Sequence, residues 1–404
     1  MLEMCSQVKS ESYTPIYFQL LITGFSLVIG IGLTRAFLPI MAYGLDPTGI
    51  FVGLVTSAFF FFRVFIELPS GLVAKRVGRR ALVVAAFLLS TIGSLLCAIS
   101  HSIYLLISGI TVWGLGAALF FLSSTSLLFD LFKANERGRG VGTFQGIEQI
   151  GMFLGAPLGA MLVGPLGFQN IFLITSMVYL CAFLMAFFSK ALKNIDAKTE
   201  NEPRALTFIE VLGGLRNWQL VAVSFIQLSR MLVTWGVMLT VFQLYLNVDR
   251  TLGVELIGLI MGARTGGMII ATFASGQLAD KIGSKLLIIT GLMTSGICLY
   301  MYTVVTTFTE IIILATIDGA GSGFAFVSLL VFMSDLVPHS IRSGAIGVYR
   351  TFQDIGGITG PIIFMFLYTS IDACAAFRAA SLLFFFNIIT LFFIKRHKPL
   401  VRRT

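Results

Sequence analysis

Charged side chains lie inside long apolar runs of this chain, and they are the residues best able to do chemistry. An unpaired charge at the centre of a bilayer costs at least ~2.5–3.5 kcal/mol. We therefore expect each of these side chains to face a protein interior or a water-filled cavity, where it binds substrate, carries a proton or pairs with an opposite charge. The set comprises Arg35, Arg63, Glu67, Glu148, Arg230, Arg264, Asp318, Arg350 and Asp354.

The composition indicates an integral membrane protein. Hydrophobic residues make up 57% of the 404 residues and charged residues only 12%, whereas soluble domains carry about 25% charged residues. Residues 1–15 are polar and many apolar runs follow the first one, so no cleavable signal peptide is expected. The runs are long enough to cross a bilayer as helices. The twelve predicted spans are 16–42, 49–73, 81–101, 104–131, 140–163, 168–190, 218–246, 254–279, 286–305, 310–336, 344–369 and 374–394.

The net charge of +9 is distributed as in a membrane protein, which argues against nucleic acid as a partner. Most Lys and Arg residues lie in the two tails or in connections after even-numbered spans, and Arg250 alone lies in a connection after an odd-numbered span. The positive-inside rule then predicts cytoplasmic N- and C-termini in the cell (plasma) membrane. The expected partners are the lipid bilayer, whose anionic headgroups attract the basic C-terminal tail, and a small-molecule substrate.

The chain contains an internal repeat. Residues 70–80 read SGLVAKRVGRR and residues 275–285 read SGQLADKIGSK, at an offset of 205 residues. Without a gap, the same offset pairs Asp130 with Asp335 and continues to the glycines of the fifth and eleventh spans. A coincidence of composition would not keep this register, so the protein is two copies of one membrane unit.

The repeated stretch resembles the signature of the major facilitator superfamily, G-x-L-x-D-R-x-G-R-[RK], which lies between the second and third spans. The resemblance covers essentially the whole chain and implies an all-α membrane fold with twelve helices in two six-helix bundles. It also implies that this motif acts in gating. The chain departs from the motif at Lys75, where the family has an acidic residue. The corresponding residues are Gly71, Lys75, Gly78, Arg79, Arg80, Gly276, Asp280 and Gly283.

The one long charged connection divides the chain into domains. We predict an N-terminal bundle over residues 1–190, a cytoplasmic linker over 191–217 and a C-terminal bundle over 218–404. The end of the linker, LTFIEVLGGLRNW, is typical of an amphipathic helix lying on the membrane surface. Each chain should hold a complete pathway and function as a monomer.

Glycines in the fifth span resemble a motif of the drug/proton antiporters within the superfamily. Glycines at such spacings let a neighbouring helix approach closely, and proline adds a bend. The motif therefore favours antiport, although a packing face without influence on transport direction explains it equally well. Against antiport, Ile110 stands where those antiporters carry an arginine. The motif residues and their repeat are Gly142, Gly151, Gly155, Pro157, Gly347, Gly356, Gly360 and Pro361.

The resemblance implies which buried charges line the cavity, because the first, fourth, seventh and tenth spans do so in this superfamily. It places Arg35, Arg230 and Asp318 nearest the substrate. Glu148 lies deep enough in its span to be partly desolvated, which favours the neutral form that proton coupling needs. Asp318 and Asp354 are equal candidates for the coupled proton. Structural ion pairs are the alternative, above all for Arg63 and Glu67, which lie four residues apart on one helical face.

Two transport functions remain open. A proton-coupled exporter of small amphipathic compounds fits the glycine motif, whereas an importer or exchanger of a small organic anion fits the excess of buried arginines. A receptor or scaffold built on the same fold is a third possible function, but it would not explain why charged residues are buried in the spans. An enzyme is not expected, since no nucleophile and base, cofactor motif or metal-ligand spacing appears.

Overall fold

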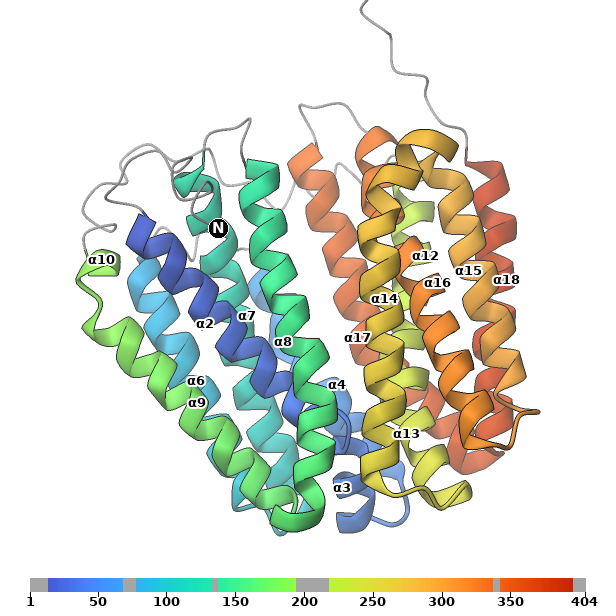
Figure 1. Ribbon diagram of the computed structural model, residues 1–404, viewed down its shortest axis with the longest axis horizontal. Coiled ribbons are helices and arrows are strands. Elements are labelled where there is room, and N and C mark those ends of the chain that lie inside the picture. Colours follow the sequence, from blue (N-terminus) through green and yellow to red (C-terminus); the bar gives the residue numbers. More distant parts are fainter. Residues whose placement is uncertain (1–13, 68–77, 133–136, 194–217, 337–341, 395–404) are drawn as a thin grey trace, which may run out of the picture. The chain divides into compact units, whose positions relative to one another are not determined.

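The computed structural model describes residues 14–67, 78–132, 137–193, 218–336 and 342–394 (Figure 1). Each of the twelve predicted spans is helical in these ranges, and no strand occurs in them. The elements are α2 (Thr14–Arg35), α3 (Leu38–Leu45), α4 (Ile50–Glu67), α6 (Arg79–Ala98), α7 (Ile103–Leu131), α8 (Arg137–Leu166), α9 (Phe168–Phe188), α10 (Lys190–Lys193), α12 (Trp218–Val233), η2 (Thr234–Val241), α13 (Phe242–Leu244), η3 (Tyr245–Asp249), α14 (Val254–Ile282), α15 (Ser284–Met301), α16 (Phe308–Leu336), α17 (Arg342–Ser370) and α18 (Ala373–Phe393).

Ten helices in the described ranges are long and apolar enough to cross a membrane. Two predicted spans fall outside this group for different reasons. α4 offers a shorter apolar stretch, Ile50–Ile66. α17 is 29 residues long but carries Arg350 and Asp354, so its composition is more polar.

The first predicted span is two helices, because Pro39 interrupts it. α2 ends at Arg35 and α3 begins at Leu38, with Pro39 in its first turn. A proline in the first turn needs no backbone N–H donor there, whereas in a continuous helix its ring would clash with the carbonyl four residues earlier. The break places Arg35 at a helix end.

The seventh predicted span is not a regular α-helix. α12 passes into the π-helical segment η2 at Thr234, and η3 is a second π-helical segment nearer the end of the span. The Thr240 hydroxyl donates to the Trp235 carbonyl five residues earlier, over 2.8 Å. Such wide turns are frequently found at functional sites, and the sequence pattern did not predict them.

The contacts divide the chain into two compact units, each with its own packing. The first consists of Met1–Pro47, Leu54–Ala205 and Leu252–Gly258, and the second of Thr48–Gly53, Leu206–Thr251 and Leu259–Thr404. In the first, α2 packs on α8, and α6 packs on α7 and α9; in the second, α12 packs on α17, and α15 packs on α16 and α18 (Figure 1). Most of the predicted linker, residues 194–217, lies outside the described residues.

The internal repeat extends to single contacts. A Cβ added to Gly114 of α7 would collide with the Phe59 carbonyl of α4. One added to Gly319 of α16 would collide with the Arg264 carbonyl of α14, and both residues stand 205 positions further along the chain. The two units therefore share their helix packing, and the predicted all-α membrane fold is confirmed.

A cation joins the third helix of each bundle to the sixth. Arg80 Nη2 donates to the Phe187 carbonyl at the end of α9 over 2.7 Å. Lys285 Nζ donates to the Ile394 carbonyl, just after α18, over 2.9 Å. Carbonyls at a helix C-terminus lack intrahelical partners and carry partial negative charge, so each cation stabilises a helix end. We call these two contacts the cationic clasps.

The rest of the predicted gating motif is described in part. Gly78 and Gly283 precede α6 and α15 with φ of 82° and 88°, a left-handed conformation that favours glycine. Arg79 is 4% exposed. Gly71 and Lys75 lie outside the described residues, and for Gly276 and Asp280 the structure describes the backbone of α14 only.

Candidate functional site

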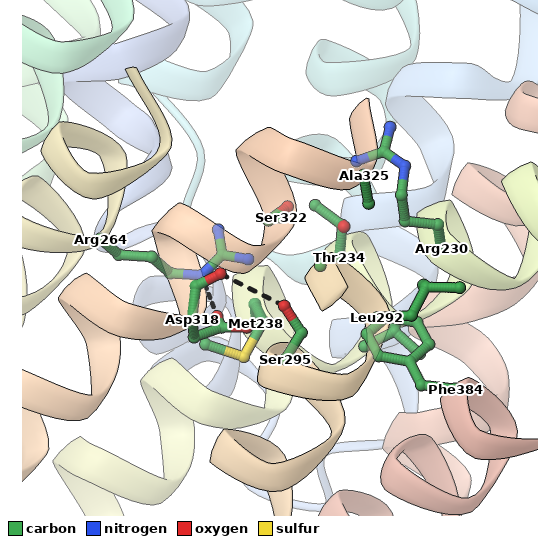
Figure 2. Close-up of a pocket in the computed structure, with 12 residues that line it drawn as sticks. Arg230, Thr234, Met238, Arg264, Leu292, Ser295, Asp318, Ser322, Ala325 and Phe384 are labelled. Carbon is green, nitrogen blue, oxygen red and sulfur yellow. Dashed lines mark hydrogen bonds and ion pairs between the residues drawn. The ribbon is translucent and has the colours of Figure 1, made fainter. Parts of the chain in front are cut away.

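The second unit contains a small pocket around a buried ion pair (Figure 2). Arg264 of α14 and Asp318 of α16 form the pair, with 2.7 Å between Nε and Oδ2, and their side chains are 7% and 3% exposed. The Ser295 hydroxyl of α15 donates to the Asp318 backbone carbonyl over 3.3 Å. The other lining residues come from α12, η2, α15, α16 and α18: Arg230, Val233, Thr234, Met238, Gly291, Leu292, Ser322, Ala325 and Phe384.

Glycines let the two helices of the ion pair approach closely. A Cβ at Gly267 of α14 would meet the Thr316 carbonyl, and one at Gly323 of α16 would meet the Met268 carbonyl. Together with Gly319, these residues remove the side chains that would otherwise separate α14 from α16. The short Asp318 side chain can therefore reach Arg264.

Arg230 is a second buried cation at this pocket, and it has no carboxylate partner within the described ranges. Its Nε donates to Gln227 Oε1 over 2.9 Å, and its guanidinium carbon lies 5.0 Å from the centre of the Phe326 ring. Gln227 Nε2 donates in turn to Gln353 Oε1 of α17 over 3.0 Å. Arg230 is 3% exposed, and Figure 2 shows it apart from the ion pair. Two arginines and one aspartate leave the pocket with an excess of positive charge.

The pocket is nearly filled in this conformation. The space between its side chains is enough for about one water molecule. Thr234 and Met238 project into it from η2, so the irregular part of the seventh span forms one wall. Binding of a larger molecule requires these helices to move apart.

Glu148 of α8 is a half-buried acid of the first unit. Its Oε1 is buried and has no hydrogen-bond partner among the described residues. Its side chain lies against α2, because a Cβ added to Gly24 would be 3.7 Å from Glu148 Cγ. Arg63 of α4 is near enough for its charge to act on the Glu148 carboxylate. An unpaired carboxylate oxygen in such a place carries a high cost when it is charged.

The other predicted charges of the first unit have apolar or soft neighbours. The Arg63 guanidinium carbon lies 5.2 Å from the centre of the Phe121 ring and 5.8 Å from that of Phe60. Arg35 Nη1 lies 3.2 Å from Met152 Sδ of α8. The side chain of Glu67 is not among those described, so its pairing with Arg63 stays a prediction.

The two charges of α17 differ in burial. Asp354 is fully buried, as expected, whereas Arg350 is exposed, contrary to the expectation that both are buried. The four-residue spacing puts both on one side of the helix, but Arg350 lies one turn nearer the beginning of α17. The structure thus brings Arg230, Arg264 and Asp318 to one pocket and places Arg350 outside it.

The glycine motif packs against the first span of its own unit. Gly155 of α8 meets Gly32 of α2, with 2.8 Å from an added Cβ to the Gly32 Cα. In the second unit, Gly356 and Gly360 of α17 meet the Leu228 and Leu232 carbonyls of α12 in the same way. Gly142 has open space around it, so close packing does not explain a glycine there.

Sequence reasoning missed the polar residues that hold Arg230, although a signal was present. Gln227 precedes Arg230 by three residues, the spacing of neighbours on a helix face. Gln353 directly precedes the predicted Asp354 and lies on the adjoining helix. Only charged residues in apolar runs were predicted as site residues, so the prediction did not include these two amides.

Comparison with known proteins identifies the family of membrane proteins to which the chain belongs. Residues 20–249 and 223–404 match the model of the Major Facilitator Superfamily. The chain belongs to this superfamily and is a membrane transporter.

Particular relatives come from bacteria. The chain is 26% identical over 358 residues to the multidrug resistance protein MdtG of Citrobacter koseri, covering 86% of each chain. It is 27% identical over 360 residues to MdtG of Salmonella arizonae, with 86% of each covered. Among solved structures, a mutant of the nucleoside transporter NupG superimposes with a TM-score of 0.73 and 14% identity, covering 93% of this chain and 98% of that chain.

Proposed function

We propose that this protein exports small amphipathic compounds in exchange for protons, by alternating access of its two bundles. The observation that carries the proposal is the buried Oε1 of Glu148, which has no hydrogen-bond partner among the described residues. A transporter that closes around a bare carboxylate must bury a charge, and protonation removes that cost. A carboxyl group that is protonated for one crossing and ionised for the other couples the movement to the proton gradient.

Similarity to proteins named for multidrug resistance supports export as the direction. The match extends over 86% of this chain and 86% of each relative. The likeness to NupG at 14% identity bears on the fold alone. Direction and proton coupling are therefore part of the proposal, as is a cell-membrane location with cytoplasmic termini.

A small organic anion is the second candidate substrate, and Arg230 favours it. Because Arg230 lines the same pocket as the Arg264–Asp318 pair and has no acidic partner among the described residues, the pocket can accept one negative charge. A carboxylate or phosphate suits a guanidinium, which donates two parallel hydrogen bonds. If the substrate is an anion, Asp318 and Asp354 would balance positive charge within the protein and would not carry the coupled proton.

Proton movement in liposomes that contain the purified protein tests both candidates. An internal pH probe is read while lipophilic cations or small carboxylates are added in turn. A pH response driven by the cations supports the exporter. A response to carboxylates alone would establish the second candidate, and no response to either would contradict proton coupling.

A pair of variants links the response to Glu148. Glu148→Gln removes the proton site and should abolish the pH response while substrate exchange persists. Glu310→Gln is the matched control, because Glu310 is exposed at the start of α16 and accepts hydrogen bonds from the Thr306 and Thr307 amides that glutamine can keep. An undiminished response in Glu148→Gln would remove this residue from the coupling role.

Orientation is tested with single cysteines in a variant that lacks the native five. Val304, 62% exposed after α15, should react with an impermeant maleimide from outside the cell. Lys190, exposed after α9, should react from the cytoplasm only. The opposite pattern would reverse the predicted topology.

A further inference from the structure

A groove runs between α15 and α18 on the surface of the second unit. It has a volume of about 350 Å³ and is lined by residues from the end of α15 and from the first half and middle of α18, among them Ile297, Tyr300, Leu382 and Phe385. The Ser381 hydroxyl donates to the Gly296 carbonyl over 2.7 Å and joins the two helices at its floor. Leu382 is 69% exposed and Tyr300 48% exposed. In a membrane these side chains meet lipid.

Arg378 is the one charged residue that lines this groove. It is exposed, although it lies within a helix that is otherwise apolar enough to span a membrane. No hydrogen bond or ion pair from another described residue reaches its side chain. A guanidinium that faces lipid must find an anion or water, because the hydrocarbon offers neither.

The groove changes in polarity along its length. Arg378 lies five residues after the start of α18 at Ala373, and Tyr300 lies at the end of α15, so both mark the end nearest the membrane surface. Phe385 lies about 10 Å deeper, given the rise of 1.5 Å per residue, and the residues between are mainly apolar. A cation and an aromatic side chain above an apolar slot match a phosphate headgroup above an acyl chain.

We propose that this groove binds an anionic glycerophospholipid, with its phosphate on Arg378 and one acyl chain between α15 and α18. The first unit supplies an internal comparison. At the offset of 205 residues, Leu173 replaces Arg378 and Leu95 replaces Tyr300, and these leucines are 37% and 39% exposed. The corresponding face of the first unit is apolar without a cation and does not select a headgroup.

Native mass spectrometry of the delipidated full-length protein tests the proposal. Phosphatidylglycerol or phosphatidylcholine is titrated into the detergent solution, and the bound copies are counted for each. The wild type should bind phosphatidylglycerol about fivefold more tightly than phosphatidylcholine, as expected for one arginine at an anionic headgroup. Arg378→Gln should remove this preference and Arg378→Lys should keep most of it. Leu382→Trp, which fills the slot, should weaken binding of both lipids.

Lys281→Gln is the matched control, because it removes one exposed cation from the same unit outside the groove. It should bind both lipids as the wild type does, and thermal unfolding should show that each variant is folded. Unchanged selectivity in Arg378→Gln would overturn the proposal, as would an equal loss in Lys281→Gln or a wild type without preference. A dimer that protects the groove would assign it to a second copy of the chain and would likewise overturn the proposal.

Discussion

The two units place different pairs of side chains at the same point of the repeat. In the second, Arg264 and Asp318 form a buried ion pair of 2.7 Å. In the first, the residues 205 positions earlier are Phe59 and Trp113, whose rings meet edge to face with centroids 6.2 Å apart. Both pairs join the same two helices of their units beside a glycine, Gly319 or Gly114.

The difference shows that packing alone does not require charge at this point. An aromatic pair contributes burial and a favourable edge-to-face contact without desolvating an ion. A buried ion pair is weak evidence of stability, since its desolvation cost offsets most of the attraction. The charge in the second unit is therefore better explained by binding than by folding.

A second pair of positions differs in the opposite direction. Glu148 in the first unit corresponds to Gln353 in the second. Glu148 has a buried oxygen that no described residue hydrogen-bonds, whereas Gln353 accepts a hydrogen bond from Gln227. This asymmetry supports a division of labour in which the first unit carries the proton and the second binds the polar part of the substrate.

The largest expected effect comes from breaking the ion pair. Asp318→Asn leaves Arg264 buried without its counter-ion, so the free energy of unfolding in detergent should fall by about 3–5 kcal/mol and transport should be lost. The double variant Arg264→Met/Asp318→Val imitates the apolar pair of the first unit and should recover most of the stability without transport. If the double variant is as unstable as the single one, packing rather than charge explains the loss.

Moving the acid between the units tests the second asymmetry. Glu148→Gln should lower uphill transport at least about tenfold, as expected when a group essential for proton transfer is removed. Adding Gln353→Glu to it should not restore transport, because a carboxylate there lies in the Gln227–Arg230 network. Recovery of proton-driven transport in the double variant would show that the two positions are equivalent. Counterflow, which needs no gradient, checks that both variants still bind substrate.

Arg230→Gln sharpens the question of what the second unit binds. A charge-assisted hydrogen bond contributes about 1.5–3 kcal/mol, so affinity for a carboxylate substrate should fall at least about tenfold. Affinity for a lipophilic cation should stay the same or rise. Equilibrium binding to the detergent-purified protein measures the affinities for the carboxylate and for the cation. If the affinity for the carboxylate is the same before and after substitution, Arg230 has a structural role only.

The smallest effect is expected at the aromatic pair of the first unit. Phe59→Leu keeps an apolar side chain but removes the edge-to-face contact, which is worth about 0.5–1.5 kcal/mol. Thermal unfolding should show a loss of this size while transport in liposomes is unchanged. A transport defect larger than the stability loss would mean that Phe59 also contacts substrate.

The sequence was sufficient for the fold because hydrophobicity and glycine spacing act locally. Long apolar runs predict spans, and Gly319 and Gly114 keep the repeat register, so twelve helical spans in two copies could be read directly. The break at Pro39 was not predicted, because whether a proline bends or breaks a span depends on the packing around it. The π-helical turns of η2 were not predicted, because they leave no pattern in residue types.

The candidate site was predictable in its members but not in their partners. A charge in an apolar run identified Arg230, Arg264 and Asp318. The sequence does not show that Arg264 pairs with Asp318, because these residues lie on different helices. It does not show that Arg230 donates to Gln227 either, because that contact joins a cation to a neutral amide. It also gave Arg350 and Asp354 the same environment, although a single turn of α17 separates exposure from burial.

The cationic clasps have a consequence for engineering by gene fission. Arg80 ties α6 to α9 and Lys285 ties α15 to the end of α18, and neither contact crosses from one unit to the other. A chain cut between the two halves would therefore keep both clasps intact. Two separately encoded fragments, ending and beginning within residues 194–217, should each insert as a six-helix piece and restore transport when produced together in one cell.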